Sequence, residues 1–329
     1  MNALNRRTLI RLAAASAATS SPLAWAQASG WPTKPVTMVV PFAAGGGTDA
    51  FGRPLSAQFA KQTGQNLIIE NRGGAGGTLG ASVASKAAND GYTLFMGAVH
   101  HTIAPSMYKR LDYDLEKDFV PLVLAATVPQ VVVVNPRNIP SPDFKSFLEL
   151  VRKSPGRFNY GSAGAGTTHH LAGEFFNSMA KTKLNHIPYR GAGPLMQDLL
   201  AGHVPMAFDG LGTSGPQIAS GKLRGLAITA PKRVPALPDV PTSAEAGLPG
   251  FEFSTWYGIL ARKGTPKEVI DRMIKEVKIA MALPAIQAAW ERNGSIVPDV
   301  SGAEFGKIIS ADVARWHKVV AESGIKVEQ

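Results

Sequence analysis

Two glycine-rich loops, each lying between an apolar strand-like run and a helix-like run, are the segments best suited to chemistry. Residues 43–47 follow the apolar run 36–40, and residues 161–166 follow the run 158–160. A helix that begins directly after such a loop leaves unpaired N–H groups and a partial positive charge at its first turn. Because glycine lets a ligand approach the backbone closely, this arrangement predicts the binding of an anion such as a carboxylate. For each loop, the alternative is an ordinary tight turn.

Two further polar residues lie where a ligand would be expected. His170 falls in the first turn of the helix after the second loop, where it could donate a hydrogen bond to a ligand or pack beside it. Asp209 ends an apolar run and precedes Gly210, so it is expected at the carboxyl end of a strand, where open α/β sheets bind ligands. Its alternative role is that of a turn aspartate that caps its own loop.

Competing motifs are weaker than this anion-binding pattern. Residues 45–50 match a dinucleotide fingerprint, with Glu70 at a later strand end, but residues 41–44 separate the preceding strand from the first glycine. His170 and Glu174 have a spacing that can hold zinc, yet no third ligand is evident. The chain has no cysteine, which excludes thiol nucleophiles and cysteine-ligated metals. We therefore predict no catalytic residue, no metal and no cofactor. The open rivals are an exported hydrolase using His170 with a serine or metal, and a secreted nucleotide-binding oxidoreductase.

The elements that must position these loops alternate between strand and helix patterns. Strands are expected at residues 36–40, 65–70 and 92–96, and a second set at 131–134, 158–160, 185–188, 206–209 and 225–229. Helical spacing of Phe51, Leu55 and Phe59 follows the first glycine loop. Because the strand–loop–helix unit occurs once in each half, we predict two parallel, doubly wound α/β sheets, with residues 251–260 returning to the first.

The length and composition of the chain agree with a globular protein of two domains. The chain has 329 residues, 45% hydrophobic and 18% charged, which excludes general disorder and allows a large core. Its net charge of +10 favours anionic partners. The lysines and arginines are scattered and form no stripe interleaved with aromatic residues, so nucleic acid is not predicted as a partner.

The first 28 residues have the features of an export signal. A basic segment containing Arg6 and Arg7 is followed by a short apolar run, and cleavage is expected after Ala26 or Ala28. The paired arginines allow the twin-arginine route as well as ordinary secretion. We therefore expect a periplasmic protein, in a compartment where ATP, NAD and nucleic acid are scarce.

The order of motifs along the chain resembles the Bug-type extracytoplasmic receptors, which are the substrate-binding components of tripartite tricarboxylate transporters. The matching motifs are Trp31-Pro32, Lys34-Pro35-Val36, Val40-Pro41-Phe42-Ala43, Gly45-Gly46-Gly47-Thr48-Asp49, Glu70-Asn71-Arg72, Gly74-Ala75-Gly76-Gly77, Asp90-Gly91-Tyr92-Thr93-Leu94, Lys117-Asp118-Phe119, Tyr160-Gly161-Ser162-Ala163-Gly164, Gly166-Thr167, His170-Leu171, Pro188-Tyr189-Arg190-Gly191, Leu237-Pro238-Asp239-Val240-Pro241-Thr242 and Glu245-Ala246-Gly247. They extend over essentially the whole chain after the export signal.

This resemblance implies a type II periplasmic-binding-protein fold, in which two α/β lobes enclose a ligand cleft. Residues 29–130 and 256–329 would form lobe 1, and residues 131–255 would form lobe 2. Carried over by position, the ligand contacts would be Phe42, Ala43, Gly46, Thr48, Asp49, Ser162, Ala163, Gly166, Thr167 and His170, with Tyr189 and Asp209 as flanking groups.

The implied function is the capture of a small organic carboxylate, without catalysis, for uptake by membrane transporter subunits. The receptor is expected to be a monomer, and an orphan sensory role is the alternative. Dicarboxylates, tricarboxylates, acidic amino acids and aromatic acids all remain candidate ligands.

Overall fold

The computed structural model describes residues 30–292, 294–323 and 325, so the predicted export signal lies outside the described residues. The strands are β1 (Val36–Val40), β2 (Leu67–Asn71), β3 (Thr93–Ala98), β4 (Phe119–Val134), β5 (Asn159–Ser162), β6 (Asn185–Pro188), β7 (Met206–Gly210), β8 (Arg224–Ile228) and β9 (Ser254–Arg262). The helices are α2 (Gly47–Thr63), η3 (Ala75–Gly77), α3 (Thr78–Ser85), α4 (His100–Met107), α5 (Leu115–Asp118), α6 (Phe144–Lys153), α7 (Thr168–Ala180), α8 (Ala192–Ala201), α9 (Leu211–Ala219), α10 (Lys267–Met281), α11 (Pro284–Glu291) and α12 (Gly302–Ser323).

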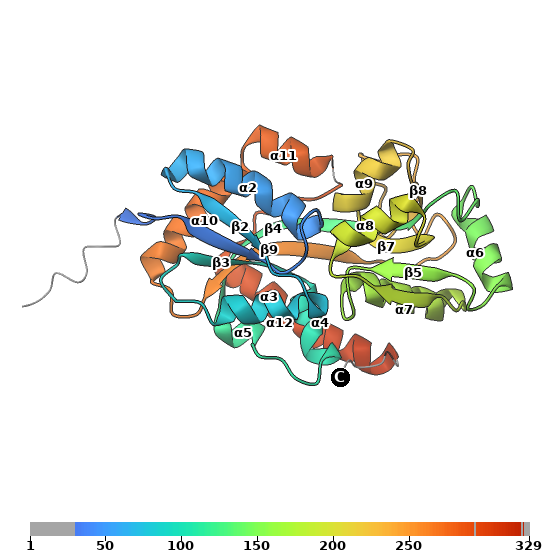
Figure 1. The fold of residues 1–329 in the computed structure, drawn as a ribbon, viewed down its shortest axis with the longest axis horizontal. Helices are drawn as coiled ribbons and strands as arrows, with labels where there is room; N and C mark the ends of the chain where they lie inside the picture. Colours follow the sequence, from blue (N-terminus) through green and yellow to red (C-terminus); the bar gives the residue numbers. More distant parts are fainter. Residues whose placement is uncertain (1–29, 293, 324, 326–329) are drawn as a thin grey trace, which may run out of the picture.

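The strands form two α/β lobes joined by two long strands that cross from one lobe to the other (Figure 1). Lobe 1 contains β2, β1, β3 and β9 in that order, and lobe 2 contains β7, β5 and β6, with β8 paired to β4. Parallel pairing is confirmed for β1 with β2 and β3, and for β5 with β6 and β7. The joining strands differ from the all-parallel prediction, because β4 pairs antiparallel with β9, β7 and β8.

Strand β4 is much longer than the predicted strand 131–134, because it changes partners part-way along. Up to Pro129 it pairs with β9, and from Gln130 onward it pairs with β7. Proline has no N–H to contribute to a strand ladder, so Pro129 fits at the end of the β9 pairing and before the β7 pairing begins. This change of partner connects the two lobes through continuous backbone.

Helices cover both faces of the strands and bury two apolar clusters (Figure 1). The cluster on one face includes Phe51 and Leu55 of α2 and Trp290 of α11. The helical spacing predicted for α2 is confirmed, since Phe51, Leu55 and Phe59 are all buried. Its helix ends at Gly64, whose φ of 73° lies in the left-handed region that favours glycine. This packing fixes the N-terminus of α2 at the carboxyl end of β1.

No helix within the described residues has both the length and the apolar character needed to cross a membrane.

Candidate functional site

The two predicted glycine loops lie against each other where the lobes meet, and they enclose a small cavity. Its volume is about 10 Å³, which is room for about one water molecule. The residues that line it are Phe42, Gly46, Gly47, Thr48, His100, Ala163, His169, Ala192 and Tyr257. Lobe 1 supplies the first loop, α4 and β9, and lobe 2 supplies the second loop and the starts of α7 and α8. A ligand larger than water does not fit this cavity in the present arrangement of the lobes.

Contacts between the lobes hold the cavity closed. The N–H of Ala43 donates to the carbonyl oxygen of Arg190 at 3.2 Å, and the hydroxyl of Tyr108 donates to the carbonyl oxygen of Ala165 at 2.8 Å. A side chain at Gly193 would place its Cβ 2.2 Å from the carbonyl oxygen of Ala44, so only glycine permits this approach. We call this arrangement, in which the two lobes are in contact, the closed form.

The first glycine loop presents free backbone donors to the cavity. Helix α2 begins at Gly47 without a side-chain cap, and the amides of Gly46, Gly47 and Thr48 have no hydrogen-bond partner among the described residues. Such amides at a helix N-terminus are suited to a carboxylate. The hydroxyl oxygen of Thr48 is likewise buried without a partner among these residues. This end of α2 therefore carries the unsatisfied donors that an anion would need.

Asp49 organises the first loop, and its carboxylate bonds to groups other than the free amides of Gly46, Gly47 and Thr48. Its carboxylate accepts hydrogen bonds from the N–H of Gly45, from Arg53 Nε and from Asn71 Nδ2. Burial raises the pKa of Asp49, but these hydrogen bonds outweigh burial and hold the pKa below its usual value. The carboxylate is thus charged at neutral pH and satisfied by the protein itself.

The second glycine loop differs chemically from the first, because the protein satisfies several of its donors. The N–H of Gly166 donates to His170 Nδ1 at 3.2 Å, and the N–H of Thr168 donates to His100 Nδ1 at 3.1 Å. Thr167 caps α7, since its hydroxyl accepts from the N–H of His170. The similar spacing of the two loops suggested two equivalent clusters of free amides. The structure shows that they are not equivalent. Lobe 2 contributes Ala163, His169 and Ala192 to the cavity lining, so its polar side chain there is His169.

Imidazole and phenol side chains complete the lining. His100 accepts a hydrogen bond at Nδ1, and burial lowers its pKa well below the usual value, so the neutral ring carries its hydrogen on Nε2. The ring of Phe42 lies edge-on to His100, with centroids 5.3 Å apart. Burial, with the nearby Asp209 carboxylate, raises the pKa of the Tyr257 phenol, which remains a neutral donor. The cavity is therefore rich in donors and lacks a fixed cation among its lining residues.

A buried histidine–aspartate pair lies beside the cavity. Asp209 Oδ2 accepts hydrogen bonds from the hydroxyls of Thr213 and Ser214, both at 2.5 Å. Asp209 Oδ1 faces His169 Nδ1 at 3.4 Å, and neither of these two atoms has a hydrogen-bond partner among the described residues. His169 lines the cavity, whereas Asp209 lies behind it.

Four of the twelve predicted contact residues line the cavity: Phe42, Gly46, Thr48 and Ala163. Ala43, Asp49, Gly166, Thr167 and Asp209 make the hydrogen bonds described above and do not belong to the lining of this closed form.

Ser162, His170 and Tyr189 also lie outside the lining and bond within lobe 2. Ser162 Oγ lies 2.6 Å from His186 Nε2 and accepts from the N–H of Gly164, so it organises its own loop. His170 stacks on His186 with ring centroids 4.0 Å apart, and burial lowers the pKa of His170 to about 4. The hydroxyl of Tyr189 donates to Asp198.

Sequence reasoning missed five lining residues: Gly47, His100, His169, Ala192 and Tyr257. Gly47 belongs to the predicted loop, and the two histidines are the first members of adjacent histidine pairs in the sequence. Those pairs were an available signal. Ala192 and Tyr257 carry no local signal, because only the closure of the lobes brings them to the cavity.

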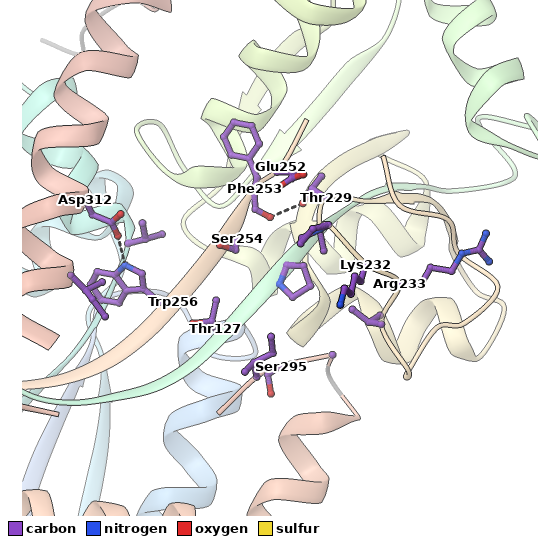
Figure 2. Close-up of a pocket in the computed structure, with 18 of the residues that line it drawn as sticks. Thr127, Thr229, Lys232, Arg233, Glu252, Phe253, Ser254, Trp256, Ser295 and Asp312 are labelled. Atoms are coloured by element: carbon purple, nitrogen blue, oxygen red, sulfur yellow. Dashed lines mark hydrogen bonds between the residues drawn. The ribbon is translucent and has the colours of Figure 1, made fainter. Parts of the chain in front are cut away.

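A much larger hollow, of about 800 Å³, lies between the lobes beside the joining strands (Figure 2). Trp256 and Asp312 lie on one side of it, joined by a hydrogen bond of 2.7 Å from Trp256 Nε1, and Lys232 and Arg233 lie on the other. Its charged lining residues are of both signs, and the free amides of α2 do not belong to it. Although this hollow is larger, the small cavity is the better anion site, because donors converge there.

Among the described residues, no group of three or more histidine, aspartate or glutamate side chains is placed to hold a metal ion.

A comparison with known protein families matches residues 51–325 to the tripartite tricarboxylate transporter family receptor. The chain belongs to this receptor family. The protein BugT of Bordetella pertussis is 31% identical to it over 330 residues, covering 100% of both chains. The predicted Bug-type resemblance is thereby confirmed. A solved relative, the periplasmic binding protein BugD, is 35% identical and superposes with a TM-score of 0.87 over 90% of this chain and 99% of that one.

Solved structures of similar chains have the same fold. A Rhodopseudomonas palustris protein with adipate superposes with a TM-score of 0.86 at 33% identity, over 90% of this chain and 99% of that one. MatC from the same organism, with bound malate, gives a TM-score of 0.83 at 33% identity, over 88% of this receptor and 100% of MatC. The predicted two-lobed binding-protein architecture is confirmed.

Proposed function

We propose that this receptor captures a small organic dicarboxylate or tricarboxylate between its lobes in the periplasm. The observation that supports this most strongly is the row of free amides from Gly46 to Thr48 facing a cavity between the lobes. The malate and adipate bound to its structural relatives have the same chemical class. Each hydrogen bond to a carboxylate contributes about 1.5–3 kcal/mol, so a few of them account for micromolar binding, which needs about 8 kcal/mol.

The remaining sequence predictions belong to this proposal. Residues 1–28 direct export, and the mature receptor is a monomer. Residues 29–130 with 256–329 move as one lobe and residues 131–255 as the other, hinged on β4 and β9. Phe42, Gly46, Thr48 and Ala163 contact the ligand directly, and the other eight predicted residues hold the surrounding loops in place. The closed form then engages the membrane subunits of a transporter.

Titration calorimetry with malate and adipate tests the proposal directly. We expect saturable binding, and at 100 times the dissociation constant the ligand should raise the free energy of unfolding by about 2.7 kcal/mol. Wild-type protein that binds no member of a wider panel of dicarboxylates and tricarboxylates would overturn the assignment.

Two variants locate the site. Gly46 lies close to the amides of Ala192 and Gly193 across the cleft, so Gly46→Phe should block closure and abolish binding. Lys232 is exposed beside the larger hollow, so Lys232→Ala should leave the affinity unchanged. If Gly46→Phe bound normally and Lys232→Ala lost affinity, the ligand site would instead be assigned to the larger hollow.

The receptor is proposed to act without catalysis. Ligand recovered after long incubation should be chemically unchanged by mass spectrometry. Turnover of the bound acid or of its esters would favour the alternative of a hydrolase that uses His170.

A further inference from the structure

The pair formed by His169 and Asp209 has a geometry that ligand anchoring by backbone amides does not require. His169 comes from the first turn of α7 and Asp209 from the end of β7, and both side chains are almost completely buried, at 4% and 0% exposure. Their facing atoms, Nδ1 and Oδ1, are 3.4 Å apart and have no other partner among the described residues. Such a pair orients the imidazole with its Nδ1 hydrogen toward the carboxylate.

This orientation fixes what the ring presents to the cavity. When Nδ1 carries the hydrogen of a neutral imidazole, Nε2 is a bare acceptor. Burial lowers the pKa of His169, against the opposing effect of Asp209, so the ring is neutral at neutral pH in this structure. A ligand carboxylate beside His169 would therefore meet a lone pair, which it cannot use as a hydrogen-bond donor.

Protonation of Nε2 removes this conflict. The imidazolium would then lie between two carboxylates, Asp209 on one side and the ligand on the other, and would donate a hydrogen bond to each. The other titratable groups that face His169 do not compete for this proton. His100 of α4 lies with its ring centroid 6.0 Å away and is kept neutral by burial, and the Tyr257 phenol of β9 is also neutral. Thr213 and Ser214 of α9 already donate to Asp209.

We propose that binding of a dicarboxylate is coupled to uptake of one proton from the solvent by His169. The inference rests on the proposed carboxylate-binding function and adds a specificity rule to it. The amides of α2 hold one carboxylate, and His169 accepts the second carboxylate only together with a proton. A ligand with a hydroxyl or amide donor at that position would instead bind the neutral ring without a proton.

Calorimetry in buffers of different ionisation enthalpy measures the protons taken up per ligand bound. With malate or adipate as probe, we expect uptake approaching one proton at a pH where His169 is neutral when empty and charged when bound. In that window the dissociation constant should rise about ten-fold for each unit of increasing pH.

His169→Gln keeps a polar side chain of similar size but cannot titrate, so its binding should be weaker, independent of pH and free of proton uptake. His203→Gln is the matched control, because His203 is an exposed histidine on the surface of lobe 2. A His169→Gln variant that still takes up a proton would overturn the assignment to His169.

The wild-type protein provides an independent readout should the variant fail to fold. Nitrogen NMR of labelled histidine should show one ring passing from the neutral to the doubly protonated form on saturation with ligand. Binding of malate or adipate with no proton uptake at every pH tested between about 6 and about 8 would overturn this inference and leave the proposed function intact. Absence of binding to any carboxylate would overturn both.

Discussion

The carboxylate of Asp49 accepts a hydrogen bond from the N–H of Gly45, four residues earlier in the chain, at 3.0 Å. The same side chain also accepts from Asn71 of β2, so it ties the first glycine loop to the strand beside it. The acid closest in sequence to the free amides of α2 is therefore a positioning residue. Its negative charge is compensated by the hydrogen bonds that it accepts from the loop, from Arg53 and from Asn71.

Asp49→Ala should weaken carboxylate binding by about ten-fold or more. Each hydrogen bond to the Asp49 carboxylate stabilises the loop by about 1.5–3 kcal/mol, and the variant loses these bonds. Titration calorimetry measures the change in affinity. The control is Asp271→Ala, which removes an exposed aspartate paired with Lys267 on the outer side of α10. Equal affinities for Asp49→Ala and wild type would show that the loop keeps its shape without this side chain.

Gly47→Ala should abolish closure around a ligand. A Cβ at this position would lie 2.0 Å from the hydroxyl oxygen of Tyr257 and 2.8 Å from the adjacent ring carbon. Tyr257→Phe removes the closer of these contacts, so the double variant should recover part of the lost affinity. Gly306→Ala on α12 has no such neighbour, with its nearest atom at 3.7 Å, and should bind like wild type. Failure of the double variant to recover any affinity would contradict a purely steric explanation.

Tyr108→Phe should shift the molecule toward an open form. The lost hydrogen bond to Ala165 joins the two lobes, and a neutral hydrogen bond contributes about 0.5–1.5 kcal/mol, which corresponds to a two- to twelve-fold weaker affinity. Small-angle X-ray scattering of the unliganded variant should show a larger radius of gyration. Tyr92→Phe is the control, because its hydroxyl bonds to Thr33 within lobe 1. An unchanged scattering profile for Tyr108→Phe would show that this bond does not govern closure.

The free energy of unfolding should fall as the pH is lowered from about 6.5 to about 4, because buried histidines are neutral in the folded state. Burial lowers the pKa of His101 to about 4, even though its hydrogen bonds with Ala98 and Gly77 act in the opposite direction. The unfolded chain binds a proton at this site near pH 6.5, so the stability conferred by the depressed pKa is complete above that value. This contribution to the free energy of unfolding is lost progressively as the pH falls toward about 4, the pKa of His101 in the folded protein.

For His101 alone, this effect amounts to about 3 kcal/mol across that range. His101→Gln should flatten the dependence of the melting temperature on pH, whereas the exposed His317→Gln should leave it unchanged. Calorimetric melts at several pH values provide the measurement. If the melting temperature depended on pH in the same way in wild type, His101→Gln and His317→Gln, the acid sensitivity would be assigned to other groups.

Much of the secondary structure could be predicted from local patterns. The short apolar run that forms β1 is typical of a buried strand, and the spacing of Phe51, Leu55 and Phe59 has the period of the helix α2 in which they lie. The length of β4 could not be predicted in this way. Pro129 interrupts the local pattern, and the strand continues past it only because its partner changes there from β9 to β7.

The sequence by itself determined the two-lobed α/β class, the family and the position of the glycine loop that precedes α2. Each of these depends on short segments whose glycines, apolar runs and motifs act locally. Only the tertiary structure decided which donors remain free. The amides of Gly166 and Thr168 are used by His170 and His100, whereas those of Gly46 and Gly47 are not. A backbone donor's availability depends on the acceptors that folding brings to it, and His100 lies 68 residues from its partner Thr168.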